Sequence, residues 1–169
     1  MAEAVTQRWG PAGTNRLKNW QGMLQEGSRP DSSEMERLTL VNTFFNKNIR
    51  FGTDLEVWEQ EDYWATPLET LGRGAGDCED FAIAKYFSLL ALGVPETKLR
   101  FVYVRALLQQ GQVLRVEPHM VLAYYKSPGA EPLVLDNLAS IIATASQRSD
   151  LTPVYSFNKE GYFNGVLRT

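Results

Sequence analysis

The stretch that most constrains the fold runs from Gly72 to Gly93. It opens with glycine at every second position, and such a loop can turn tightly or bring its backbone close to a ligand. Asp77 then has the position of a helix N-cap, and Asp80 follows three residues later as a capping-box acid. We therefore expect a largely buried helix that ends at Gly93. Its apolar residues are Phe81, Ala84, Phe87, Leu89, Leu90 and Leu92.

The only cysteine of the chain, Cys78, falls in the first turn of this helix. Unpaired backbone N–H groups and the positive end of the helix dipole favour a thiolate there. A single cysteine excludes an internal disulfide and leaves a free thiol. The alternative is a small buried hydrophobic residue, which free cysteines often are. The glycine-rich approach and the cap favour a nucleophile.

The first third of the chain predicts helices. Residues 1–13 are expected to be a disordered or artificially added N-terminal segment, because of two glycines and a proline. A short helix is predicted for Thr14 to Leu24. Ser33 and Glu36 form a second capping box that opens a helix to about Asn48. The residues expected to face inward from that helix are Met35, Leu38, Val41, Phe45 and Ile49.

Residues from Phe51 to Leu71 show less regular patterning and include Trp58, Tyr63 and Trp64 among several acids. One interpretation is a surface loop held to the core by its aromatic residues. The other is one wall of a binding cleft, since long connections inside compact domains are often functional. The sequence leaves both open.

The second half of the chain is rich in β-branched and aromatic residues and predicts antiparallel strands. Helices that precede a run of strands indicate an α+β domain, which we place at residues 14–169. Leu138 to Ala145 is the exception, predicted as a helix or a turn of one. The predicted strands are Lys98 to Leu108, Val113 to Val116, His119 to Tyr125, Leu133 to Asp136, Leu151 to Phe157 and Tyr162 to Leu167.

The register of one hairpin brings together the only histidine, His119, and Asp136. If Ser127 to Ala130 form a four-residue loop, Lys126 pairs with Glu131 as opposite charges on neighbouring strands. Asp136 then lies on the same face as His119 and diagonal to it, where an imidazole and a carboxylate can hydrogen-bond. A slip of one residue would place them on opposite faces.

These residues make a candidate Cys–His–Asp system. Cys78 would be the nucleophile, His119 the base, and Asp136 the group that orients the imidazole. The alternative for His119 is a purely structural role, which is common for a lone histidine in a strand.

Three acids surround the thiol, namely Asp77, Glu79 and Asp80. Carboxylates at that position disfavour ionisation of the thiol. In the structural interpretation, some of these carboxylate oxygens accept backbone N–H groups at the start of the helix. The functional alternative is a hard cation, because hard cations take oxygen ligands. The spacing is not that of an EF-hand loop.

Charge and hydropathy argue against several classes of protein, namely nucleic-acid-binding and membrane proteins. The net charge is −3 without a basic cluster, so the chain has no electrostatic footprint for nucleic acid or an anionic membrane. No apolar run approaches the length of a membrane span, and no leader peptide is recognisable.

Taken together, the motif from Gly76 to Tyr86 and the upstream segment from Tyr63 to Pro67 resemble the bacterial transglutaminase-like cysteine proteinases, and among them the LapG-type periplasmic adhesin proteases. The resemblance extends from about Trp9 through most of the chain. His119 in Pro-His-Met-Val-Leu and Asp136 in Leu-Val-Leu-Asp-Asn match the other two catalytic positions.

The resemblance implies a papain- or transglutaminase-like fold, with the cysteine helix packed on an antiparallel sheet that carries His119 and Asp136. It implies proteolysis of a large surface adhesin near its N-terminus at a dialanine site, which disperses biofilm. It also implies Ca²⁺ held by Asp77 and Glu79, with Asp80 carried over less firmly. An inner-membrane receptor for cyclic di-GMP would sequester the protease in the periplasm.

The predicted mechanism is attack of Cys78 on a backbone carbonyl. The oxyanion would be held by the Cys78 backbone N–H and by a second donor, the indole of Trp58 or Trp64. Two alternatives remain open: acyl transfer to an amine by the same residues, and a non-catalytic module that binds peptides.

Overall fold

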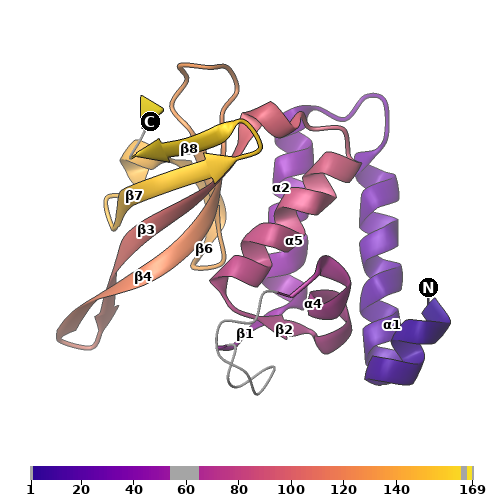
Figure 1. Ribbon diagram of the computed structural model, residues 1–169. Helices are drawn as coiled ribbons and strands as arrows, with labels where there is room; N and C mark the ends of the chain where they lie inside the picture. Colours follow the sequence, from indigo (N-terminus) through magenta and orange to yellow (C-terminus); the bar gives the residue numbers. More distant parts are fainter. Residues whose placement is uncertain (1, 54–64, 165–166, 169) are drawn as a thin grey trace. The chain divides into compact units, whose positions relative to one another are not determined.

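The structure is a computed structural model that describes residues 2–53, 65–164 and 167–168. The chain forms two compact units, Met1–Val94 and Pro95–Thr169, and each is described by itself (Figure 1). The organisation of residues 14–169 as one domain stays a prediction. Trp58, Tyr63 and Trp64, predicted as a cleft wall or as oxyanion donors, lie outside the described residues.

The described part of unit 1 is built from helices and one short pair of parallel strands. The strands pair Arg50 with Ala75 and Phe51 with Gly76. In its described part the elements are α1 (Ala2–Gly27), α2 (Glu34–Asn48), β1 (Arg50–Phe51), α4 (Pro67–Arg73), β2 (Ala75–Gly76) and α5 (Cys78–Ala91).

Helix α1 differs from the prediction at its start. Irregular structure was expected for residues 1–13, but the helix begins at Ala2 and continues through a kink at Gly10, where φ is 75° and ψ is −173°. Tertiary packing outweighs the glycines and the proline, because Val5 is 1% exposed and the ring of Trp9 lies against Gly72. The glycines and Pro11 therefore kink the helix and do not prevent it.

Helix α2 begins where its cap predicts. The Ser33 side chain accepts the Glu36 backbone N–H, and the helix runs antiparallel to α1 (Figure 1). The predicted inward residues Leu38, Val41, Phe45 and Ile49 are buried. The prediction is wrong for Met35, which is 46% exposed. The helical periodicity of apolar residues extends into the first turn of α2, but the buried core does not extend that far.

Helix α5 packs against α2 and is also joined to α1. The buried Lys85 donates from Nζ to Asn42 Oδ1 and Asn46 Oδ1, both at 2.8 Å. The Trp20 indole of α1 donates to Ser88 Oγ at 2.9 Å. A lysine that is 1% exposed needs such acceptors, so these bonds fix which face of α5 turns inward.

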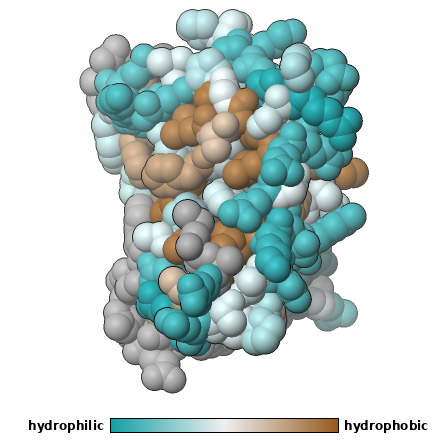
Figure 2. Space-filling view, turned by 90° about the vertical axis from the view of Figure 1, so that its right-hand side faces the viewer, coloured by the Kyte–Doolittle hydropathy of each residue, from teal (hydrophilic) through white to brown (hydrophobic). Residues whose placement is uncertain are grey.

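One residue of α5 predicted to be buried is exposed. Phe87 is 50% exposed. It lines an apolar groove of about 420 Å³ with Trp20, Ala65, Thr66, Pro67, Ile83 and Ala91. Figure 2 views the molecule from the side on which α1 lies in Figure 1, and it shows apolar residues gathered within a mainly hydrophilic surface.

Unit 2 is an antiparallel sheet in which seven described strands have the order β6-β5-β4-β3-β7-β8-β9. Helices followed by an antiparallel sheet confirm the predicted α+β class. The elements are η1 (Glu96–Lys98), β3 (Leu99–Gln110), β4 (Val113–Tyr124), β5 (Leu133–Asp136), β6 (Ala139–Thr144), η2 (Ala145–Gln147), β7 (Leu151–Asn158), β8 (Gly161–Asn164) and β9 (Leu167–Arg168).

Two predictions for this half of the chain need correction. The segments Val113 to Val116 and His119 to Tyr125 join into the single strand β4. Pro118 is tolerated between them because β4 pairs with β5 only from Leu122 onward, so a missing N–H breaks no ladder bond on that side. The predicted helix at Leu138 to Ala145 is instead mainly the strand β6, which pairs antiparallel with β5 through Ala139, Ala143 and Thr144.

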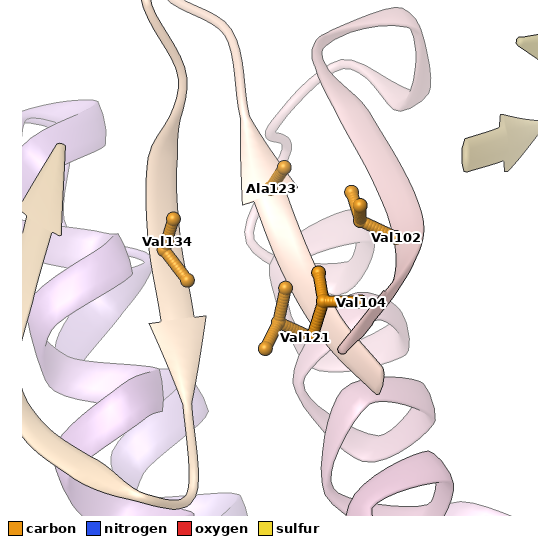
Figure 3. Close-up of a cluster of buried hydrophobic side chains, with 5 residues drawn as sticks. All are labelled: Val102, Val104, Val121, Ala123 and Val134. Atoms are coloured by element: carbon orange, nitrogen blue, oxygen red, sulfur yellow. The ribbon is translucent and has the colours of Figure 1, made fainter. Parts of the chain in front are cut away.

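One face of the sheet carries a cluster of small apolar side chains (Figure 3). The cluster comes from β3, β4 and β5 and consists of Val102, Val104, Val121, Ala123 and Val134. Val102 lies opposite Val121, and Ala123 lies opposite Val134. His119 continues the same face of β4, because side chains two residues apart in a strand point the same way.

Candidate active site

Asp77 and Asp80 form the predicted capping box at the start of α5. Asp77 Oδ1 accepts the Asp80 backbone N–H at 3.3 Å, and Asp80 Oδ2 accepts the Asp77 backbone N–H at 3.1 Å. The box fixes the point at which the helix starts. It thereby places Cys78 in the first turn, as predicted.

Asp80 is a structural residue in unit 1. Its second oxygen, Oδ1, accepts the Ala65 backbone N–H at 3.0 Å, and the residue is 1% exposed. A Cβ at Gly76 would lie 2.8 Å from Asp80 Cβ, so glycine is needed for the strand to pass. The glycine-rich loop is therefore explained by close packing in unit 1, including a left-handed Gly74 (φ 72°) that ends α4.

Cys78 is not enclosed in the core. It is half-buried, and its Sγ lies 3.5 Å from Glu79 Oε2. A thiol in this position can be reached by a substrate, which the alternative of a fully buried cysteine would not allow.

The three acids around Cys78 are not equivalent. Asp77 and Glu79 are half-buried, whereas both oxygens of Asp80 accept backbone N–H groups. Within residues 2–53, 65–164 and 167–168, no group of three or more histidine, cysteine or acidic side chains is placed to hold a metal. The assignment of Asp77, Glu79 and Asp80 as metal ligands stays a prediction.

His119 and Asp136 meet in unit 2 as the hairpin register predicts. Leu122 pairs with Leu135 and Tyr124 with Leu133, which is the register of a four-residue loop from 127 to 130. His119 Nε2 lies 2.6 Å from Asp136 Oδ1. Both side chains are buried, at 7% and 2% exposed.

Sequence reasoning missed a third member of this group, Arg148. Its Nη2 donates to Asp136 Oδ2 at 2.8 Å, and the residue is 9% exposed. Its guanidinium also bonds Asp150, at 3.0 Å from Nε and 2.9 Å from Nη2. No sequence signal marks Arg148, which lies 12 residues after Asp136 in a polar stretch.

These contacts keep Asp136 ionised. Burial would raise the pKa of its carboxyl, but the hydrogen bond and charge of His119 lower it, as do the Leu138 backbone N–H and the hydrogen bond from Arg148. The net result is a pKa below the ordinary value. An ionised carboxylate only accepts hydrogen bonds, so His119 donates from Nε2 and Nδ1 keeps the lone pair that can take a proton.

A nucleophile candidate at a helix N-terminus and a histidine oriented by an ionised carboxylate define the class of thiol enzymes that use a Cys–His–Asp system. Cys78 belongs to unit 1, and His119 and Asp136 belong to unit 2. The family model of the bacterial transglutaminase-like cysteine proteinases matches residues 19–157. The chain belongs to this family and is a cysteine protease.

Solved structures of Legionella pneumophila LapG are similar to this chain at 40% sequence identity. The calcium-bound form matches over 99% of this chain and 88% of that one, with a TM-score of 0.82. A second LapG structure matches over 96% of this chain and 87% of that one, and the EGTA-treated form matches over 96% of this chain and 84% of that one. Both have a TM-score of 0.78. The fold is transglutaminase-like, as expected.

A comparison with curated proteins found no match. Among the described residues, no helix has both the length and the apolar character that a membrane span requires.

Proposed function

We propose that this cysteine protease is a calcium-dependent endopeptidase that cleaves a large cell-surface adhesin near its N-terminus, at a dialanine site, and so promotes biofilm dispersal. The observation that carries the catalytic part is the 2.6 Å contact between His119 and Asp136. The substrate part is supported by the similarity to LapG and by the motif around Cys78.

In the proposed mechanism, His119 Nδ1 takes the proton of Cys78, and the thiolate attacks the carbonyl carbon of the scissile bond. The Cys78 backbone N–H at the helix start donates to the resulting oxyanion, with an indole of Trp58 or Trp64 as the second donor. The imidazolium then gives its proton to the leaving amine, which departs as the new N-terminus. Water attacks the remaining thioester, His119 takes its proton, and the thiol is restored.

Asp136 and Arg148 act on this cycle through His119. Asp136 holds Nε2 and so keeps Nδ1 available for the thiol proton. Arg148 occupies the other carboxylate oxygen, which keeps Asp136 ionised and fixed in orientation. We therefore assign Arg148 as a positioning residue of the site.

Calcium would be held at the start of α5. Asp77 and Glu79 carry the hard oxygen donors that Ca²⁺ prefers, whereas Asp80 already uses both oxygens within unit 1. A bound Ca²⁺ supplies positive charge that offsets the acids beside Cys78. The calcium-bound LapG structure supports this part of the proposal.

The same resemblance supports residence in the periplasm and sequestration by an inner-membrane receptor that responds to cyclic di-GMP. Adding the periplasmic part of such a receptor should suppress cleavage in proportion to the complex formed. Unchanged cleavage by a fully complexed enzyme would remove the receptor from the proposal.

The test of the function is incubation with an adhesin N-terminal fragment that contains a dialanine site. We expect cleavage between the two alanines, loss of cleavage in EGTA, and recovery when Ca²⁺ is added. A fragment with the alanines replaced by bulky residues should stay intact. Cleavage elsewhere, or cleavage indifferent to EGTA, would contradict the substrate or the calcium part respectively.

A further inference from the structure

Unit 2 contains an apolar cavity of about 250 Å³ beside the His119–Asp136 pair. Its floor is the cluster of small side chains shown in Figure 3, from β3, β4 and β5. The rest of the wall comes from Tyr125, Glu131, Pro132, Ala145, Arg148, Leu151 and Pro153.

The cavity floor is continuous with the catalytic pair. Val104 lies directly opposite His119 in the β3–β4 register, where Cβ atoms are about 5 Å apart. Val121 follows His119 by two residues, and Val134 precedes Asp136 by two. Side chains at that spacing share a face and lie about 6.6 Å apart.

Arg148 joins the cavity to the catalytic pair. The same side chain lines the cavity and bonds Asp136. Its Nη1 is buried and has no hydrogen-bond partner within the described part of the chain. A peptide carbonyl is an acceptor of the kind that this donor lacks.

The size and lining of the cavity select its occupant. A dry apolar cavity of about 150 Å³ already accepts benzene, whereas pockets for small-molecule ligands span about 300–1,000 Å³. At about 250 Å³, this cavity fits one large apolar side chain better than a whole cofactor. Small floor residues, Ala123 above all, leave that space open.

We propose that this cavity receives one leucine- or phenylalanine-sized side chain of the peptide substrate, about two residues from the cleaved bond. The inference rests on the proposed cleavage of a peptide substrate at a dialanine site. An extended peptide places every second side chain on one side at a rise of about 3.3 Å per residue, which matches the spacing of Val121 from His119. The small residues at the cleaved bond would then be flanked by one large apolar anchor.

The first test is a scan of peptides that contain one dialanine site in a polar background, with a single leucine moved through the flanking positions. We expect one position within three residues of the cleaved bond to raise kcat/KM about tenfold over alanine, chiefly through a lower KM. The variant Ala123→Leu fills the floor and should abolish this preference. The variant Val116→Leu, on an exposed part of the hairpin, should retain it.

A preference that is absent from the native enzyme, or that survives in Ala123→Leu, would overturn the cavity proposal. Cleavage of the alanine peptide by the native enzyme would leave the protease function standing in that case. The two proposals therefore fail separately.

A second measurement needs no activity. Titration of the native protein with N-acetyl-leucine amide, followed by NMR of the valine methyl groups, should shift Val121 and Val134 but not Val116. The shifts should vanish in Ala123→Leu. Equal shifts with N-acetyl-serine amide, or none with the leucine compound, would overturn the proposal.

Discussion

Arg148 holds one oxygen of Asp136 at 2.8 Å while His119 holds the other at 2.6 Å. The carboxylate thus lies between a permanent cation and the proposed catalytic base, buried from water. Such a carboxylate is held in one orientation, and the imidazole that it orients is fixed with it.

Replacing Arg148 with methionine should impair both stability and turnover. The change leaves a buried carboxylate without its cation, which costs about 3 kcal/mol of unfolding free energy. We expect kcat to fall roughly tenfold with little change in KM, because the histidine is less well positioned. Denaturant unfolding and steady-state kinetics measure the two effects.

Two further variants serve as controls for that prediction. Asp150 also bonds Arg148, but its side chain is 39% exposed. Asp150→Asn should therefore cost about 1 kcal/mol or less of unfolding free energy and leave kcat unchanged. Arg148→Lys keeps the charge and should recover part of kcat. Equal kcat in the native, methionine and lysine proteins would remove Arg148 from the site.

Acid should destabilise the protein through Asp136. The pKa of this carboxyl is lowered in the folded state, so its contribution to stability is complete above the unfolded pKa of about 3.9 and is lost as the pH falls through the lower folded value. In Arg148→Met the folded pKa rises toward the unfolded value, so this variant should lose less stability than the native protein as the pH falls. Unfolding free energies between pH 3 and 6 test this, and identical pH dependence in both proteins would contradict it.

Variants of Asp80 and Glu79 should distinguish a structural role from a role in calcium binding. Asp80→Ala removes two acceptors of buried N–H groups and should cost about 2–4 kcal/mol with or without Ca²⁺. Glu79→Gln should leave stability in EGTA unchanged and weaken Ca²⁺ binding measured by calorimetry. Equal Ca²⁺ affinity in Glu79→Gln and the native protein would exclude Glu79 as a ligand.

The His119–Asp136 contact was predictable because it depends on local chemistry. A four-residue loop sets the register, and the register sets the face. The start of α5 was predictable for the same reason, because Asp77 and Asp80 lie three residues apart in a capping box. Helix α4 was missed although Thr66, Pro67 and Glu69 carry the same kind of signal.

The remaining features depend on contacts between residues distant in sequence. Arg148 reaches Asp136 only because β6 folds back along β5, whereas the sequence predicts a helix there. The helix through residues 2–13 likewise depends on packing of Trp9 against Gly72. Neither periodicity nor spacing carries such information.

The central claim is that Cys78 and His119 act together on one peptide bond. The most direct measurement is rapid-quench intact-mass analysis of the enzyme mixed with a dialanine peptide in Ca²⁺. We predict a transient thioester adduct on Cys78 in the native protein, and neither adduct nor product in His119→Ala or Cys78→Ala. Near-native cleavage by either variant, or native cleavage without any adduct on Cys78, would contradict the account.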